Sequence, residues 1–516
     1  MKPNFLGRLA ALTAVAVLAG APLAAPALAQ EAAPAAAAAA ATPAPAAEAP
    51  AAPAPAEAAP AAAEPEAPAP EANKGDTTWM LISTILVMLM IIPGLALFYG
   101  GLVRQKNMLS MLMQVSTVTV VGMITWILWG YTLAFTDGGA ANKFVGGLSK
   151  LGLAGVGVGS NVETFSVGVV IPELAFVAFQ MTFACITAAL VLGGLAERIK
   201  FSATVLFAVI WPIIVYYPMA HMVWWWAGAT SGAGVEAATT AAGAGLLWGW
   251  GAIDFAGGTV VHINAGIAAL VGSIILGKRT GFQKEPMPPH SLTLTMVGAG
   301  LLWVGWFGFN AGSNLEANGY AALAMVNTFI ATAAAGFSWV VVEWVTRKKA
   351  SMLGMASGIV AGLVAITPAA GFAGPLGALI LGLAVSPVCV FFCSAVKNAL
   401  KYDDSLDAFG IHAVGGIIGA LGTGLLVNPA WGGQGIVDYS TCGADGAAIT
   451  VCATAYDLGF QMMAQTKAVG VAILWSTIGS AVVFLLIKYT VGLRVTAETE
   501  EDGLDISEHG ERAYHT

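Results

Sequence analysis

Residues 254–272, DFAGGTVVHINAGIAALVG, place a single histidine inside a long uncharged stretch of the chain. After Asp254 no Asp, Glu, Lys or Arg occurs until Lys278, and most residues between them are Gly, Ala, Val, Ile or Leu. A helix of about 20 such residues crosses the roughly 30 Å hydrocarbon core of a membrane. The stretch therefore predicts a membrane-spanning helix. His262 is a candidate functional residue, because ionisable groups are costly inside a membrane.

The whole chain has the composition of a membrane protein. Of its 516 residues, 58% are hydrophobic and only 10% are charged, whereas soluble domains carry roughly 25% charged residues. From Trp79 onward, eleven apolar runs are long enough to span a bilayer. We therefore expect an all-α integral membrane fold of eleven transmembrane helices. Their expected centres are Met90, Met123, Phe183, Trp211, Ala268, Leu302, Ile330, Val360, Gly382, Ile417 and Leu474.

The N-terminal region differs from the rest. Two basic residues precede a short apolar stretch and then Ala27-Leu28-Ala29, which is the layout of a secretory signal peptide. The alternative is a first transmembrane helix, but the apolar stretch is too short to span a bilayer. A segment rich in Ala, Pro and Glu follows, and it predicts a disordered periplasmic spacer. The expected divisions are a signal peptide (1–29), the spacer (30–75), the eleven-helix domain (76–494) and a cytoplasmic regulatory tail (495–516).

The basic residues predict the orientation. If the N-terminus is exported, successive loops alternate between outside and inside. Of the 21 Lys and Arg residues, four lie near the chain ends and fourteen fall in loops expected inside. Only Lys143, Lys150 and Lys467 fall in loops expected outside. This bias towards the cytoplasm predicts that the N-terminus is out and the C-terminus in.

Ten of the spans divide into two sets of five, and an odd number in each set inverts the second set relative to the first. The eleventh span is then an added helix. His262 to Gly272 can be laid over the segment that begins at His412, and each histidine follows an aspartate, Asp254 or Asp407. We therefore expect two inverted five-helix repeats.

The two histidines at matching points suggest a shared role. A neutral imidazole pair can share a hydrogen bond and relay polar groups or protons through a dry path. A metal site is the competing interpretation, but no further His, Cys or carboxylate is placed to complete a coordination sphere. We expect no metal, no cofactor and no enzymatic activity, since no nucleophile–base pair or phosphate-binding loop stands out. No basic stretch indicates nucleic acid.

Six separated segments between about residue 76 and the end resemble the ammonium transporter/Rhesus family, in the family's order. The last of them is similar to the tail of the bacterial branch. They are PGLALFYGG (93–101), FQMTFACIT (179–187), DFAGGTVVHIN (254–264), WFGFNAGS (306–313), FGIH (409–412) and GLDISEHGERAY (503–514). The resemblance implies a homotrimer in the bacterial inner membrane, with a pore for ammonium or ammonia in each subunit and methylammonium as a further candidate substrate.

The resemblance also implies roles for single residues. Trp224 and Ser313 match an outer site that recruits ammonium, and Asp254 matches the acidic residue beneath it. Phe183 and Phe309 match two stacked phenylalanines that close the outer pore. His262 and His412 match the twin pore histidines.

Simple physics fits these roles. An aromatic face attracts a small cation by about 0.5–2 kcal/mol, and Ser313 can accept an N–H bond. A charged ion is costly to move through hydrocarbon, whereas neutral ammonia is not. Ammonium is therefore expected to lose a proton near the phenylalanines, which K⁺ cannot do.

Simpler readings of the same residues stay open. Most membrane aromatics are core or interface residues, and Asp254 could cap a helix, a role we expect in addition to attracting cations. Trp225 and Trp226 follow Trp224, so another tryptophan could form the cation platform. Gln180, His221, Trp306 and Asp407 are expected to be mainly structural.

Two further expectations concern partners and cysteines. The family resemblance implies that a cytoplasmic PII-type signalling protein blocks the pore, and an ammonium sensor that signals through a cytoplasmic partner is the alternative function. Cys442 and Cys452 lie in one exported loop, which favours a disulfide over two free thiols.

Overall fold

Long helices make up almost all of the structure. The computed structural model describes residues 71–514, except 167, 228–242, 438–452 and 455. The expected signal peptide, most of the spacer and both candidate disulfide cysteines lie outside the described residues. Ten helical stretches of the described chain are long and apolar enough to cross a membrane.

The spans are built from one to three helical segments each, and several include a π-helical turn. The first four are α2 (Lys74–Leu89), η1 (Met90–Leu95) and α3 (Ala96–Leu102); α4 (Met108–Thr125), η3 (Trp126–Gly130) and α5 (Tyr131–Phe135); α6 (Glu173–Val191) and η6 (Leu192–Gly194); and α7 (Phe201–Trp211), η7 (Pro212–Tyr216) and α8 (Tyr217–Trp224). The next three are η9 (Gly258–Ile263) and α10 (Asn264–Leu276); α11 (Leu292–Gly312); and α12 (Gly319–Arg347). The last three are α14 (Pro375–Phe391), η10 (Phe392–Val396) and α15 (Lys397–Leu400); η11 (Phe409–Ala413) and α16 (Val414–Leu426); and α17 (Leu458–Thr490).

An eleventh apolar helix, α13 (Met352–Ile366), has 15 residues and is shorter than these spans. Each of the eleven centres expected from the sequence lies within a helix. Ten spans of full length are therefore confirmed, and the number eleven stays a prediction.

Short elements fill the connections between the spans. Five of them are 3-10 helices: η2 (Gln105–Asn107), η4 (Gly139–Ala141), η5 (Leu151–Leu153), η8 (Trp248–Trp250) and η12 (Pro429–Trp431). Two are antiparallel strand pairs, β1 (Asn161–Glu163) with β2 (Val170–Pro172) and β3 (Ile436–Val437) with β4 (Ala453–Thr454).

The helix starts have local causes in the sequence. Asn73, Ser291, Asn318, Ser351 and Asp457 each precede a helix and accept a hydrogen bond from a backbone N–H group of its first turn. These side chains satisfy donors that no helical carbonyl can reach. Polar caps therefore mark where α2, α11, α12, α13 and α17 begin.

The two helices that carry His262 and His412 cross at very short range. A Cβ atom on Gly266, four residues after His262, would lie 2.3 Å from the Ala413 backbone nitrogen. A Cβ on Gly416, four residues after His412, would lie 2.9 Å from the Gly258 carbonyl oxygen and 3.0 Å from the His262 Cβ. Each glycine thus packs against the π-helical turn of the other helix, and this crossing brings the two histidines together.

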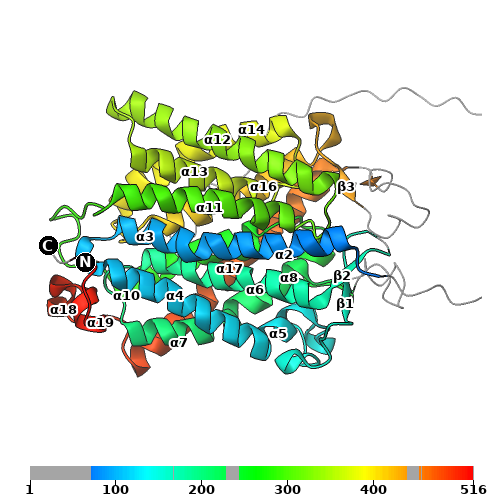
Figure 1. The fold of residues 1–516 in the computed structure, drawn as a ribbon. Helices are drawn as coiled ribbons and strands as arrows, with labels where there is room; N and C mark the ends of the chain where they lie inside the picture. The colour runs from blue at the N-terminus through cyan, green and yellow to red at the C-terminus, as the bar shows by residue number, and fades with distance from the viewer. Residues whose placement is uncertain (1–70, 167, 228–242, 438–452, 455, 515–516) are drawn as a thin grey trace, which may run out of the picture. The chain divides into compact units, whose positions relative to one another are not determined.

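The two ends of the helices carry different structures. Figure 1 shows β1 and β2 at one end and two short helices near the C-terminus, α18 (Ala497–Asp502) and α19 (Leu504–His509), at the other. We call these the cavity end and the tail end.

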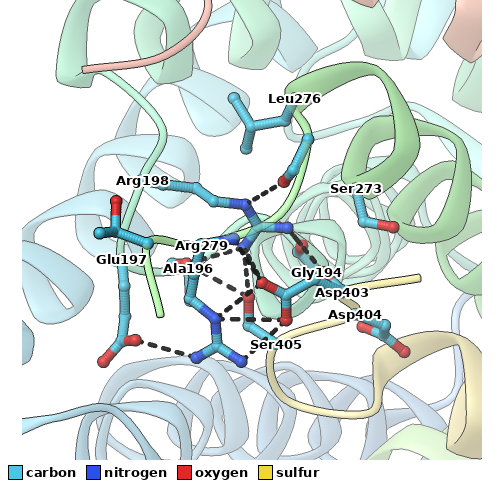
Figure 2. A network of polar contacts seen from close by, with 12 residues as sticks. Gly194, Ala196, Glu197, Arg198, Ser273, Leu276, Arg279, Asp403, Asp404 and Ser405 are labelled. Carbon is cyan, nitrogen blue, oxygen red and sulfur yellow. Dashed lines mark hydrogen bonds and ion pairs between the residues drawn. The ribbon is translucent and has the colours of Figure 1, made fainter. Parts of the chain in front are cut away.

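Buried charges join the loops at the tail end (Figure 2). Arg279 binds the Asp403 carboxylate through Nε and Nη2, at 3.0 and 2.9 Å, and Glu197 through Nη1 at 2.9 Å. Arg198 is fully buried and donates to carbonyl oxygens that include those of Gly277 and Asp403. Burial alone would raise the pKa of Glu197, but Arg279 and Arg104 lower it to about 2. The carboxylates are therefore ionised, and the network holds three loops together.

The C-terminal tail packs against the same end. Asp505 accepts hydrogen bonds from the backbone nitrogens of Leu109 and Ser110 at the start of α4, at 3.0 and 2.8 Å. Glu508 accepts one from the first residue of α7 at 2.9 Å. Glu500 is buried and pairs with Arg494 at 2.6 Å. Carboxylates at helix N-termini are favourable because of the helix dipole, so the tail is held by its acidic side chains.

Candidate functional site

A cavity of about 430 Å³ opens at the cavity end. Its lining includes Trp224 and Ser313, the two residues expected to recruit ammonium, together with Gln180 and Phe255. These residues come from α6, α8, the end of α11 and the segment before η9. The structure therefore brings two predicted site residues from distant parts of the chain to one cavity.

The geometry of Trp224 and Ser313 leaves polar and aromatic groups available to a ligand. The Trp224 ring nitrogen donates to the Asp254 carbonyl oxygen at 2.9 Å, which fixes the ring. The Ser313 hydroxyl donates its hydrogen to the Phe309 carbonyl oxygen at 2.8 Å. Because that hydrogen is already used, the Ser313 oxygen presents lone pairs and can accept an N–H bond.

Two phenylalanines lie below the cavity. The rings of Phe183 and Phe309 are stacked, with centroids 4.1 Å apart and planes within 16°. Trp224 meets Phe183 edge-on at 5.8 Å. Both phenylalanines are almost completely buried, at 1% and 0% exposed. The two rings are stacked below the cavity, at the place where the sequence predicts a gate, and we call them the phenylalanine gate.

The histidine pair continues the same column of rings. His262 lies 6.1 Å from Phe309 and 5.4 Å from His412, between ring centroids, and the two imidazoles are within 16° of parallel. Among the described residues, neither ring nitrogen of His262 has a hydrogen-bond partner, nor has Nδ1 of His412. The hydrogen bond that the pair could share is thus not formed in this arrangement. The free nitrogens are available to a small polar molecule beside the rings.

Asp254 acts as a helix cap. Its Oδ1 accepts from the backbone nitrogens of Gly257 and Gly258, at 2.8 and 2.6 Å, and its Oδ2 accepts from Thr259 at 2.7 Å. The carboxylate therefore faces the start of η9. Its link to the cavity runs through its carbonyl oxygen, which binds Trp224.

Asp404, rather than Asp407, holds the place before η11 that Asp254 holds before η9. Asp404 accepts from the backbone nitrogens of Ala408 and Phe409, at 3.1 and 2.8 Å, at the start of η11. Burial raises the pKa of Asp404 to about 6. Asp407 instead pairs with Lys397 at 2.7 Å. Asp254 and Asp404 each stand eight residues before their histidine, a spacing that could have identified the pair.

Sequence reasoning also missed the place of Trp306. Its ring stacks on His262 at 5.3 Å, and its nitrogen donates to the Thr367 hydroxyl at 2.9 Å. Trp306 therefore borders the histidine pair directly.

His221, by contrast, fits the structural role expected of it, since both ring nitrogens lie within 3.0 Å of carbonyl oxygens. Within the described part of the chain, no three His, Cys, Asp or Glu residues lie close enough together to hold a metal ion.

Known proteins resemble this chain over most of its length. The model of the Ammonium Transporter Family matches residues 78–514. An ammonium transporter of Aquifex aeolicus is 44% identical over 447 residues, which cover 86% of this chain and 94% of that protein. The crystal structure of Saccharomyces cerevisiae Mep2 aligns with a TM-score of 0.68 at 32% identity, over 83% of this chain and 91% of that one. A structure described as a Sensor Amt Protein aligns with a TM-score of 0.71 at 26% identity, over 84% and 98%.

Proposed function

Because the chain belongs to the ammonium transporter family, we propose that it recruits ammonium in the cavity, removes a proton near the phenylalanine gate and conducts ammonia past the histidine pair. The observation that carries this proposal is the unbroken column of rings. It runs from Trp224 through Phe183, Phe309 and His262 to His412, with successive centroids 4.1–6.1 Å apart.

Recruitment rests on Trp224 and Ser313. The ring face of Trp224 attracts a monovalent cation, and the Ser313 oxygen accepts one of its N–H bonds. A K⁺ ion has no hydrogen to donate to Ser313. Asp254 is a positioning residue in this mechanism, since its carboxylate caps η9 and its carbonyl oxygen fixes the Trp224 ring.

The gate and the histidines act on the proton. A cation that left the cavity would lose its water between two buried rings, and no carboxylate follows in the column to compensate its charge. Neutral ammonia meets no such barrier, so ammonium gives up its proton at or near Phe183 and Phe309, and the proton returns to water in the cavity or is passed on by the histidines. The free nitrogens of His262 and His412 then accept hydrogen bonds from ammonia or pass a proton.

The proposed topology has eleven transmembrane helices, with the cavity outside the bacterial inner membrane and the tail in the cytoplasm. Both the excess of basic residues in the loops expected inside and the apolar character of α13 support it. Two inverted five-helix repeats, with α17 added, are supported by the matched pairs Asp254 with Asp404 and Gly266 with Gly416. Trimerisation is proposed from family membership alone.

The direct test is transport by the purified protein. The full-length protein reconstituted into planar bilayers should pass ammonium-dependent flux or current, and K⁺ at the same concentration should give at least about tenfold less, because a desolvated charge costs several kcal/mol. A protein that admits K⁺ as readily as ammonium would contradict deprotonation at the gate.

The tail is the proposed docking element for a cytoplasmic PII-type protein. Replacing Asp505 with Ala removes the acceptor of two N–H groups at the start of α4. Losing such a cap costs about 0.5–2 kcal/mol, so protease cleavage within 495–516 should accelerate by about two- to thirtyfold and inhibition by the PII-type protein should weaken. Glu511→Ala, at an exposed position of the same tail, is the matched control. Equal cleavage and equal inhibition in both variants would rule out this role.

A sensor is the second candidate function, favoured by the similarity to the Sensor Amt Protein structure. It predicts that ammonium binding in the cavity changes protection of the tail without net uptake. Ammonium flux and tail cleavage are therefore measured on the same protein. Net uptake indicates a transporter, whereas a change in cleavage without uptake indicates a sensor.

A further inference from the structure

The cavity has a second aromatic wall beyond Trp224. Phe165, Trp226 and Trp248 line the same cavity. The ring planes of Phe165 and Trp226 are parallel within 4°, with centroids 6.4 Å apart, and those of Trp226 and Trp248 are within 15° at 5.4 Å. We call these three residues the outer aromatic wall. It is built from the β1–β2 connection, the segment after α8 and the start of η8.

Backbone pairing supports this wall. Trp226 forms an antiparallel bridge with Ala244. The Leu247 backbone nitrogen donates to the Met222 carbonyl oxygen at 2.8 Å, and that of Gly245 donates to the Trp225 carbonyl oxygen at 3.0 Å. The segment that carries Trp248 is therefore fastened to the end of α8. The backbone that carries Trp226 and Trp248 is therefore held in place beside the cavity.

The cavity has the volume and charge to hold more than one cation. Its 430 Å³ far exceeds the roughly 30 Å³ that a water molecule, similar in size to ammonium, takes in the liquid. Asp137 lines it with a carboxylate. The positive charge of Lys150, which also lines it, is paired with the buried Glu173 carboxylate. Carboxylates in a cleft raise the local concentration of cations.

We propose that the outer aromatic wall is a second binding subsite for ammonium and small methylated ammonium ions, which they occupy before they reach Trp224. This rests on the proposed transport function. A cation–π contact forms over the face of a ring, within about 6 Å of its centroid. All three rings line the cavity and are only partly buried, so a cation in the cavity can approach the ring faces that their stacking leaves open. The wall thus extends recognition of ammonium to the mouth of the cavity.

The test uses tetramethylammonium as the probe. It has four methyl groups and cannot pass between rings whose centroids are 4.1 Å apart, so it acts only from the cavity. We expect it to inhibit ammonium uptake by the reconstituted full-length protein. Trp226→Leu should raise its inhibition constant by about two- to thirtyfold, the range of a lost cation–π contact. Trp226→Phe, which keeps a ring, should restore most of the inhibition.

Trp250 supplies the matched control. It belongs to η8 like Trp248, but it is 36% exposed and faces Lys467, whose Nζ lies 5.6 Å from its ring. Trp250→Leu should leave the inhibition constant unchanged, whereas Trp248→Leu should raise it. Phe165→Leu replaces Trp226→Leu as the test if the latter lowers the amount of folded protein.

Two results would overturn the subsite. One is a parent protein that transports ammonium but is not inhibited by tetramethylammonium. The other is inhibition that disappears in Trp224→Leu and is unchanged in the variants of the wall, which would place the probe at Trp224. A parent that transports no ammonium would instead defeat the proposed function. In that case calorimetry can still measure tetramethylammonium binding to the parent and to Trp226→Leu. Weaker binding to the variant would support the subsite, and equal binding would overturn it.

Discussion

Replacing His262 or His412 with Asp is expected to turn the pore into one that conducts ammonium as an ion and admits K⁺. Both imidazoles lie in a buried column of rings with free nitrogens and no neighbouring carboxylate among the described column residues. An Asp there supplies a counter-charge for a desolvated cation. Removing a charge barrier of about 2.5–3.5 kcal/mol should raise K⁺ conduction on the order of a hundredfold. The measurement is K⁺ and ammonium current per amount of folded protein.

His262→Leu is the matched comparison. It removes the imidazole without adding a charge, so transport should slow while K⁺ stays excluded. If the histidines only fill space, both substitutions should lower the amount of folded protein and the activity together, and ion preference should not change. Asp variants that fold and still exclude K⁺ would show that the twin-histidine mechanism is wrong.

Asp403→Ala is expected to destabilise the protein by about 3–5 kcal/mol, the cost of removing one partner of a buried ion pair. The carboxylate receives the Nε and Nη2 groups of Arg279 and lies 4.0 Å from Arg198. Without it, Arg279 keeps Glu197 as an ion-pair partner, whereas the fully buried Arg198 loses the carboxylate that lies 4.0 Å from it. Thermal unfolding in detergent should show a clear fall in the midpoint temperature.

Arg347→Ala provides the contrast. Arg347 pairs with Glu343 one helical turn away at 3.0 Å, and its side chain is 57% exposed. Glu343 is buried, but it also accepts hydrogen bonds from the Ser351 backbone nitrogen and hydroxyl, which remain in the variant. A pair one helical turn apart with an exposed partner contributes about 0.3–0.5 kcal/mol, so the midpoint of Arg347→Ala should hardly move. Equal shifts in the two variants would mean that the buried network does not hold the tail-end loops together.

The sequence was most informative where single residues stand out against an apolar background. His262 and His412 were identifiable because ionisable residues are rare in spans, and the structure places their rings 5.4 Å apart. Phe183 and Phe309 could not be chosen among 22 phenylalanines without the family resemblance, because stacking depends on how α6 and α11 pack. The eleven apolar runs located the helices because burial in lipid requires little beyond length and composition.

The remaining features depend on contacts between distant segments. The position of Trp306 against His262 and the assembly of the outer aromatic wall arise from tertiary packing. The match of Asp254 with Asp404 was hidden because Asp407 lies closer to His412 in the sequence, and only the hydrogen bonds show which carboxylate caps the helix.

The crossing at Gly266 and Gly416 limits how this pore can diverge during evolution. Because backbone meets backbone there, with 2.3 Å from a Cβ on Gly266 to the Ala413 nitrogen, no single amino-acid replacement at either glycine can widen the passage in a small step. Even alanine would force the two helices apart. New solute preferences in descendants of this gene are therefore expected from the side chains that line the cavity and the column of rings, while the distance between the two helices is inherited unchanged.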